Sequence, residues 1–133
     1  MKATRPAGFL NVDLDIESSG SLKSFVDEMG GAIIVLHSSH VKGIHFLRLE
    51  STCEAENPDH VVADLCRAVE RLKPPGRKAW DRAKRKEFNV GYDLRGGVRR
   101  VEVALLPRTV KRIAALGASV GFTCYRDNDS EQL

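Results

Sequence analysis

The side chains best suited to bind a partner lie in the basic segment from Lys73 to Lys86. Lysine and arginine can neutralise the phosphates of a nucleic acid, and a tryptophan among them can stack on a base. The same cations, with an aromatic anchor, can instead bind an acidic protein surface. The candidate contact residues are Arg77, Lys78, Trp80, Arg82, Arg85 and Lys86.

Charge is unevenly distributed along the chain. Residues 1–66 contain five Lys and Arg against ten Asp and Glu, residues 67–112 contain fifteen against five, and residues 113–133 contain one against three. The net charge of +3 therefore conceals a strongly basic middle third. Such asymmetry bears on partners rather than on fold. Because no recognised nucleic-acid-binding motif accompanies it, we favour an acidic protein partner, with nucleic acid as the alternative.

Histidines and cysteines offer weaker chemistry. His37, His40 and Cys53 could share a zinc ion, since imidazole and thiolate are zinc ligands, but the two histidines fall where a polar connection is expected. Cys66 and Cys124 fall on apolar faces, where a thiol is usually inert. The sequence contains no phosphate-binding loop, dinucleotide fingerprint or nucleophile elbow. We therefore expect a non-enzymatic protein without metal or cofactor, and a small metal-dependent or cysteine enzyme is the least favoured alternative.

An acidic row indicates a second kind of partner. Asp13, Asp15 and Glu17 alternate with apolar residues, so they share one face of a predicted strand. Carboxylates on an exposed strand are more often solubilising than catalytic. If this strand lies at a sheet edge, it could pair with a second copy, although the two acidic rows would then oppose each other. Self-association, through this strand or another surface, is the prediction.

Length and composition predict one domain. A chain of 133 residues with 42% hydrophobic residues can bury a core without disulfides. Three cysteines, an odd number without short paired spacing, favour a reducing cytoplasm. No apolar run approaches the roughly 20 residues that cross a membrane. We expect an N-terminal tail over residues 1–8, a domain over 9–126 and an acidic C-terminal tail over 127–133.

Hydrophobic periodicity predicts the elements that position these residues. Strands are predicted at residues 10–16, 32–36, 44–49, 88–92, 101–105 and 120–124, with hairpins joining the second strand to the third and the fourth to the fifth. Helices are predicted at residues 22–29, 58–72, 77–87 and 107–116. The expected fold is α+β, with a mainly antiparallel or mixed sheet of about six strands and two to four helices, in the ferredoxin-like or split β-α-β style.

The last quarter of the chain resembles a known family. Leu106-Pro107, a short helix, Leu116-Gly-Ala-Ser119, an apolar strand and Tyr125 follow one another within residues 98–126. This order is similar to that of a bacterial family classified only as a domain of unknown function. The resemblance implies a small cytoplasmic α+β protein and supplies no site residues. For a chain of this size, a toxin-neutralising (immunity-type) role is one concrete form of protein binding.

Overall fold

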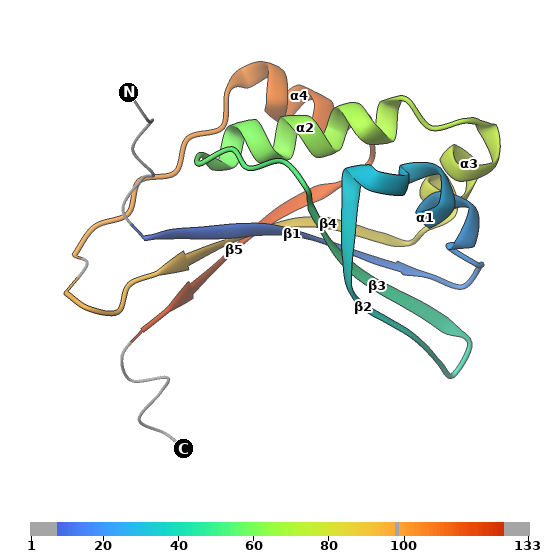
Figure 1. Cartoon of the computed structure of the whole chain (residues 1–133), viewed down its shortest axis with the longest axis horizontal. Helices are drawn as coiled ribbons and strands as arrows, with labels where there is room; N and C mark the ends of the chain where they lie inside the picture. The colour runs from blue at the N-terminus through green and yellow to red at the C-terminus, as the bar shows by residue number, and fades with distance from the viewer. Residues whose placement is uncertain (1–7, 98, 127–133) are drawn as a thin grey trace.

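One five-stranded sheet carries its α-helices on a single face (Figure 1). The computed structural model describes residues 8–97 and 99–126. Its elements are β1 (Phe9–Ser18), α1 (Lys23–Met29), the 3-10 helix η1 (Gly30–Ala32), β2 (Ile33–Val41), β3 (Ile44–Ser51), α2 (Pro58–Glu70), α3 (Pro74–Arg82), β4 (Arg85–Asp93), α4 (Pro107–Ala115) and β5 (Ser119–Tyr125). The predicted α+β class is confirmed, with four α-helices in this part of the chain. None of these helices is long and apolar enough to cross a bilayer.

The strand order is β2-β3-β1-β4-β5. β1 pairs antiparallel with both β3 and β4, and β2 pairs antiparallel with β3. β5 lies parallel to β4, and α4 connects these two strands. The first four strands with α1 and α2 therefore have the order of a ferredoxin-like fold, and β5 extends it to a mixed sheet.

β1 does not lie at an edge of the sheet, because it is paired on both sides, so the condition for its pairing with a second copy is not met. The first residues of β1 also depart from the predicted alternation of buried and exposed side chains. A register shift between Phe9 and Asn11 turns Phe9 into the core and leaves Leu10 exposed. A bulge adds one residue to one strand, so the alternation changes phase there. Self-pairing through the acidic row is thereby excluded.

Two further predictions fail around β4. Residues 101–105 form no strand, although they alternate in hydrophobicity, because β1 and β5 already occupy both sides of β4. The helix predicted over residues 77–87 begins earlier, at Pro74, and ends at Arg82. Lys84 N donates to Glu17 O, and from Arg85 onward the chain belongs to the sheet. The start of the predicted 1–8 tail lies outside the described residues, but its last residue, Gly8, accepts a hydrogen bond from Asp93 N.

Trp80 is the largest side chain that is fully buried between the sheet and the helices. Its ring stacks on Phe25 of α1, with centroids 5.8 Å apart. Its indole Nε1 donates to the carbonyl oxygen of Leu116, which follows α4, at 2.9 Å. One residue of α3 thus connects to α1 and to the end of α4.

Replacing Trp80 should destabilise the fold by an amount that depends on the residue that replaces it. Trp80→Phe should lower the free energy of unfolding by about 1–3 kcal/mol, because the Leu116 carbonyl loses its donor. Trp80→Ala should lower it by about 3–5 kcal/mol, because a large cavity is left. Urea denaturation followed by circular dichroism measures both values. Lys78→Ala, on the exposed side of the same helix, should change stability by less than about 0.5 kcal/mol. An alanine variant as stable as the wild type would contradict this assignment.

Candidate functional site

The predicted contact residues do not form one surface. Arg77, Lys78 and Arg82 lie on α3, whereas Arg85 lies on β4. Arg85 is held by Glu17 at 3.3 Å and by Glu87 at 3.2 Å. Its charge is thus balanced within the sheet, and Arg85 does not belong with the cations of α3.

Trp80 and Lys86, two other predicted contact residues, lie against each other. Trp80 has no accessible surface, so it can neither stack on a base nor anchor a partner. The Lys86 ammonium lies 5.5 Å from the centroid of the Trp80 ring, in a cation–π contact. Burial lowers the pKa of Lys86. Trp80 therefore cannot contact a partner directly, whereas the contact predicted for Lys86, which is half-buried, stays a prediction.

The start of α3 is fixed by a carboxylate from another helix. Pro74 and Pro75 occupy the first two helical positions and have no N–H, so Gly76 supplies the first donor. Gly76 N donates to Glu28 Oε2 of α1 at 2.8 Å. A Cβ at position 76 would approach Glu28 Oε1 to 2.5 Å, so a larger residue there would displace this carboxylate. At the other end of α3, Arg82 donates to Ser21 O at 3.4 Å.

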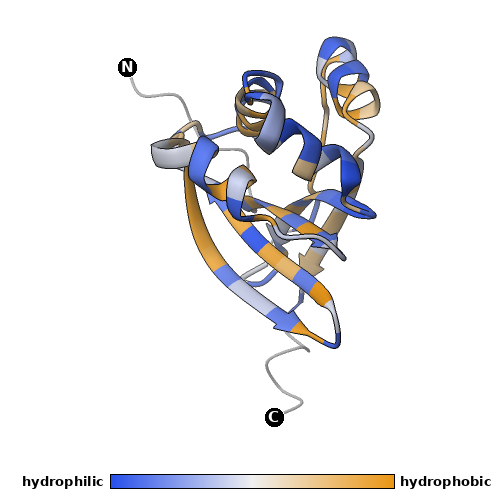
Figure 2. Cartoon of the chain, turned by 90° about the vertical axis from the view of Figure 1, so that its right-hand side faces the viewer, coloured by the Kyte–Doolittle hydropathy of each residue, from blue (hydrophilic) through white to orange (hydrophobic). Residues whose placement is uncertain are grey.

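Cations without a carboxylate partner gather around α3. Within the described part of residues 67–112, ion pairs involve Arg67, Arg77, Arg85, Arg95, Arg100 and Arg112. Five exposed cations from the end of α2 to the start of β4 form no such pair with any described residue, namely Arg71, Lys73, Lys78, Arg82 and Lys84. We call these five residues the cationic end. It lies at the end of the molecule that faces the viewer in Figure 2.

The candidate contact residues include Lys78 and Arg82 of the cationic end but not Arg71, Lys73 or Lys84, although Lys73 and Lys84 belong to the basic segment. Arg71 and Lys73 precede the predicted helix, and Lys84 follows the observed one. The Pro74-Pro75 pair could have indicated them, because it forces a break between two helices and so brings the end of α2 beside α3. Which cations lack a carboxylate depends on tertiary pairing, and no local pattern contains that information.

A pocket of about 470 Å³ opens beside the cationic end, between α1, η1 and the end of α2. Met29, Ala32, Ala68 and Leu72 provide apolar lining, while Arg71, Lys73, Asp27 and Glu28 provide charges. Glu28 Oε1 is buried and has no hydrogen-bond partner among the described residues. The pocket can therefore receive an apolar side chain whose flanking carboxylates reach Arg71 and Lys73.

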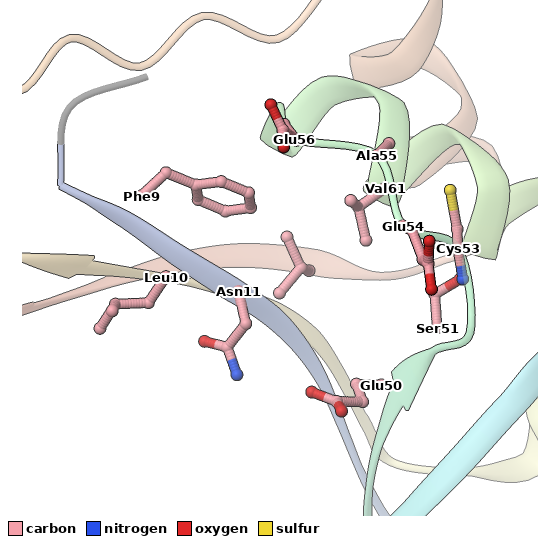
Figure 3. A pocket seen from close by; sticks show the side chains of 11 residues that line it. Phe9, Leu10, Asn11, Glu50, Ser51, Cys53, Glu54, Ala55, Glu56 and Val61 are labelled. Atoms are coloured by element: carbon pink, nitrogen blue, oxygen red, sulfur yellow. The ribbon is translucent and has the colours of Figure 1, made fainter. Parts of the chain in front are cut away.

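A second pocket, of about 360 Å³, lies between β1 and the segment that leads to α2 (Figure 3). The side chains of Glu50, Glu54 and Glu56 surround it, and Cys53 lies at its wall. Cys53 N donates to Ser51 Oγ at 2.9 Å. No histidine is among the described residues that line it, so the general base that activates a cysteine nucleophile is not supplied there.

The predicted metal ligands are not brought together. β2 and β3 continue to a two-residue turn at Lys42 and Gly43, so His37 and His40 lie on a strand rather than in a connection. His40 stacks on His45, with ring centroids 3.8 Å apart, whereas Cys53 follows the opposite end of β3. Within the described ranges, no group of three or more His, Cys, Asp or Glu residues has the geometry to hold a metal ion.

Carboxylates occupy the face of the sheet opposite to the helices. Asp15 is buried and accepts two hydrogen bonds from Arg48, at 2.8 and 3.3 Å. Asp13, in register with Glu50, accepts a hydrogen bond from Asn11 and forms no ion pair with a described residue. Partial burial raises the pKa of Asp13, and the nearby charges of Asp15 and Glu50 raise it further. In the acidic row, the charge of Asp15 is therefore balanced by Arg48, whereas the ionised form of Asp13 is destabilised.

The raised pKa of Asp13 predicts that removing its charge stabilises the fold in a pH-dependent way. A carboxyl group with a raised pKa in the folded state favours folding when protonated and opposes it when ionised. Asp13→Asn should therefore raise the urea midpoint at pH 7, and the gain should disappear by about pH 3, where aspartate is protonated in both states. The amide oxygen can still accept from Asn11. Glu54→Gln, at an exposed position, serves as the control, and a lower midpoint for Asp13→Asn at pH 7 would contradict the analysis.

The three cysteines should differ in reactivity. Burial raises the pKa of Cys66 to about 12, whereas Cys124 is exposed. Since the thiolate is the reactive form, only about one Cys66 in ten thousand is ionised at pH 8. Iodoacetamide at pH 8, followed by peptide mass analysis, should label Cys124 in the folded protein and Cys66 only after unfolding in urea. Equal labelling of both in the folded protein would refute this.

No family model, curated protein or solved structure matches the chain. The resemblance of residues 98–126 to a family of unknown function therefore remains a prediction.

Proposed function

We propose that the protein is a non-enzymatic binding module whose cationic end binds an acidic protein partner. The observation that carries the proposal is the contrast between the two groups of cations. Arg48 and Arg85 on the sheet are paired with carboxylates, whereas the five residues of the cationic end are exposed and form no such pair with any described residue. A patch of exposed like charge attracts a partner of opposite charge and accelerates its association.

A protein fits this surface better than a nucleic acid. Trp80, the aromatic side chain of the basic segment, is buried and offers no stacking platform. Arg85 lies on β4, in ion pairs, so it does not extend the cationic end. The lining of the neighbouring pocket combines apolar residues, which suit a hydrophobic side chain, with Asp27 and Glu28, which would repel a phosphate. Binding of nucleic acid by the cations of α3 is the second candidate.

A toxin-neutralising, immunity-type role is one form that such binding could take. An inhibitor of this kind needs a rigid, charged surface and no catalytic machinery, which agrees with five exposed cations on and around a carboxylate-capped helix. A cytoplasmic, bacterial setting belongs to the same proposal, and the free cysteines at positions 53, 66 and 124 are in keeping with it.

Charge reversal at the cationic end tests the proposal. Lys78→Glu combined with Lys84→Glu should weaken binding to a fluorescein-labelled peptide of alternating glutamate and leucine by about tenfold or more, because two attractive charges become repulsive. Fluorescence anisotropy at low salt measures the affinity. Arg108→Glu combined with Lys111→Glu changes the net charge equally, but on α4, and should leave the affinity close to that of the wild type.

The outcomes separate the two candidates. Tight binding to single-stranded or duplex oligonucleotides, with a steep loss on adding salt, would favour nucleic acid over protein. Equal loss of peptide binding in both double variants would indicate an effect of net charge alone and would contradict a specific site. Failure of the wild type to bind the peptide, together with failure to retain any protein from a bacterial lysate, would overturn the proposal.

A further inference from the structure

The outer strand β2 lacks most of the features that protect a sheet edge. It forms one border of the sheet and is nine residues long. Between Ile33 and Val41 the sequence contains no Lys, Arg, Asp, Glu or Pro. Natural edge strands are usually short, charged, interrupted by proline or covered, because their free N–H and C=O groups otherwise pair with another chain. A register shift between Val35 and His37 is the protective irregularity that β2 does have.

Large apolar side chains are exposed along this strand. Ile34, Val35, Leu36 and Val41 have 47%, 41%, 46% and 61% of their surface accessible, and Figure 2 shows the apolar stretch along the outer strand of the hairpin. They occupy both sides of the sheet. Val35 is in register with the buried Leu49, whereas Ile34 is in register with Glu50. A strand added at this edge would cover apolar surface on both faces.

We infer that β2 pairs antiparallel with β2 of a second copy of this chain. Antiparallel pairing about a two-fold axis places each β2 against itself, and a closed dimer results. Identical strands then meet without like-charge repulsion, because neither contributes a charged side chain. The two sheets would join into one continuous sheet of ten strands, with both helix layers on the same side. This inference does not depend on the proposed function, since the cationic end lies on other elements.

The opposite edge is less suited to the same pairing. β5 has seven residues, and Gly121 lies near its centre. Glycine in a strand has no side chain to pack and lowers strand stability. β5 nevertheless exposes Phe122, at 51%, so it provides a matched control for substitutions at an edge. Pairing of β2 with β5 would not close and would produce an open chain of molecules.

Sedimentation velocity on the full chain over a range of concentrations tests the inference. The wild type should sediment as a dimer at tens of micromolar. Val35→Lys should give monomer at the same concentration, because each copy would place a charged side chain in a joint that otherwise has none. Val41→Lys, in the other half of the strand, should do the same if Val35→Lys impairs folding, and circular dichroism checks the fold of each variant. Phe122→Lys on β5 should remain a dimer.

Three results would overturn the inference. The first is a wild type that stays monomeric at all concentrations, which would leave the edge to an extended peptide of another protein. The second is loss of the dimer with Phe122→Lys but not with Val35→Lys or Val41→Lys, which would assign the contact to β5. The third is growth into long oligomers, which would indicate pairing of β2 with β5. Faster amide hydrogen exchange in β2 of Val35→Lys than in the wild type would support the inference independently.

Discussion

The burial of Trp80 is the constraint on which the helix layer depends. A nine-residue helix is too short to be stable alone in water, so α3 exists because its tryptophan is packed. Stacking on Phe25 and donation to the Leu116 carbonyl orient the helix relative to α1 and to the end of α4. With Ala79 and Trp80 facing inward, the remaining side chains of α3 have to face solvent. The exposed cations are thus a direct result of how the core is packed.

Part of the excess positive charge of the basic segment is neutralised within the fold, and part remains exposed at the cationic end. Glu17 from the acidic half pairs with Arg85 from the basic segment, and Glu28 binds the backbone of Gly76. These contacts use acidic residues of the first half to position the basic segment. The charge that they leave uncompensated is concentrated around α3, which is why the cationic end is smaller than the basic segment.

Most of the elements could be predicted from local patterns, and the failures have non-local causes. Alternation and capping residues located β1, the β2–β3 hairpin and α2, since a one-sided core imposes these periods. Residues 101–105 have the same alternation, but no edge of β4 was free to pair with them. The contact residues were predicted less well. The burial of Trp80 and the pairing of Arg85 depend on segments far away in the sequence.

The Glu28 carboxylate and the two prolines at the start of α3 have a consequence for the thermodynamics of association. Proline fixes the backbone angle φ of the first turn, and Glu28 holds the next amide in place. The helix is therefore already ordered before any partner arrives. Little backbone entropy is lost when its cations are engaged, so more of the electrostatic attraction is retained as affinity. The rigidity of its first turn makes a short helix an efficient surface for recognition.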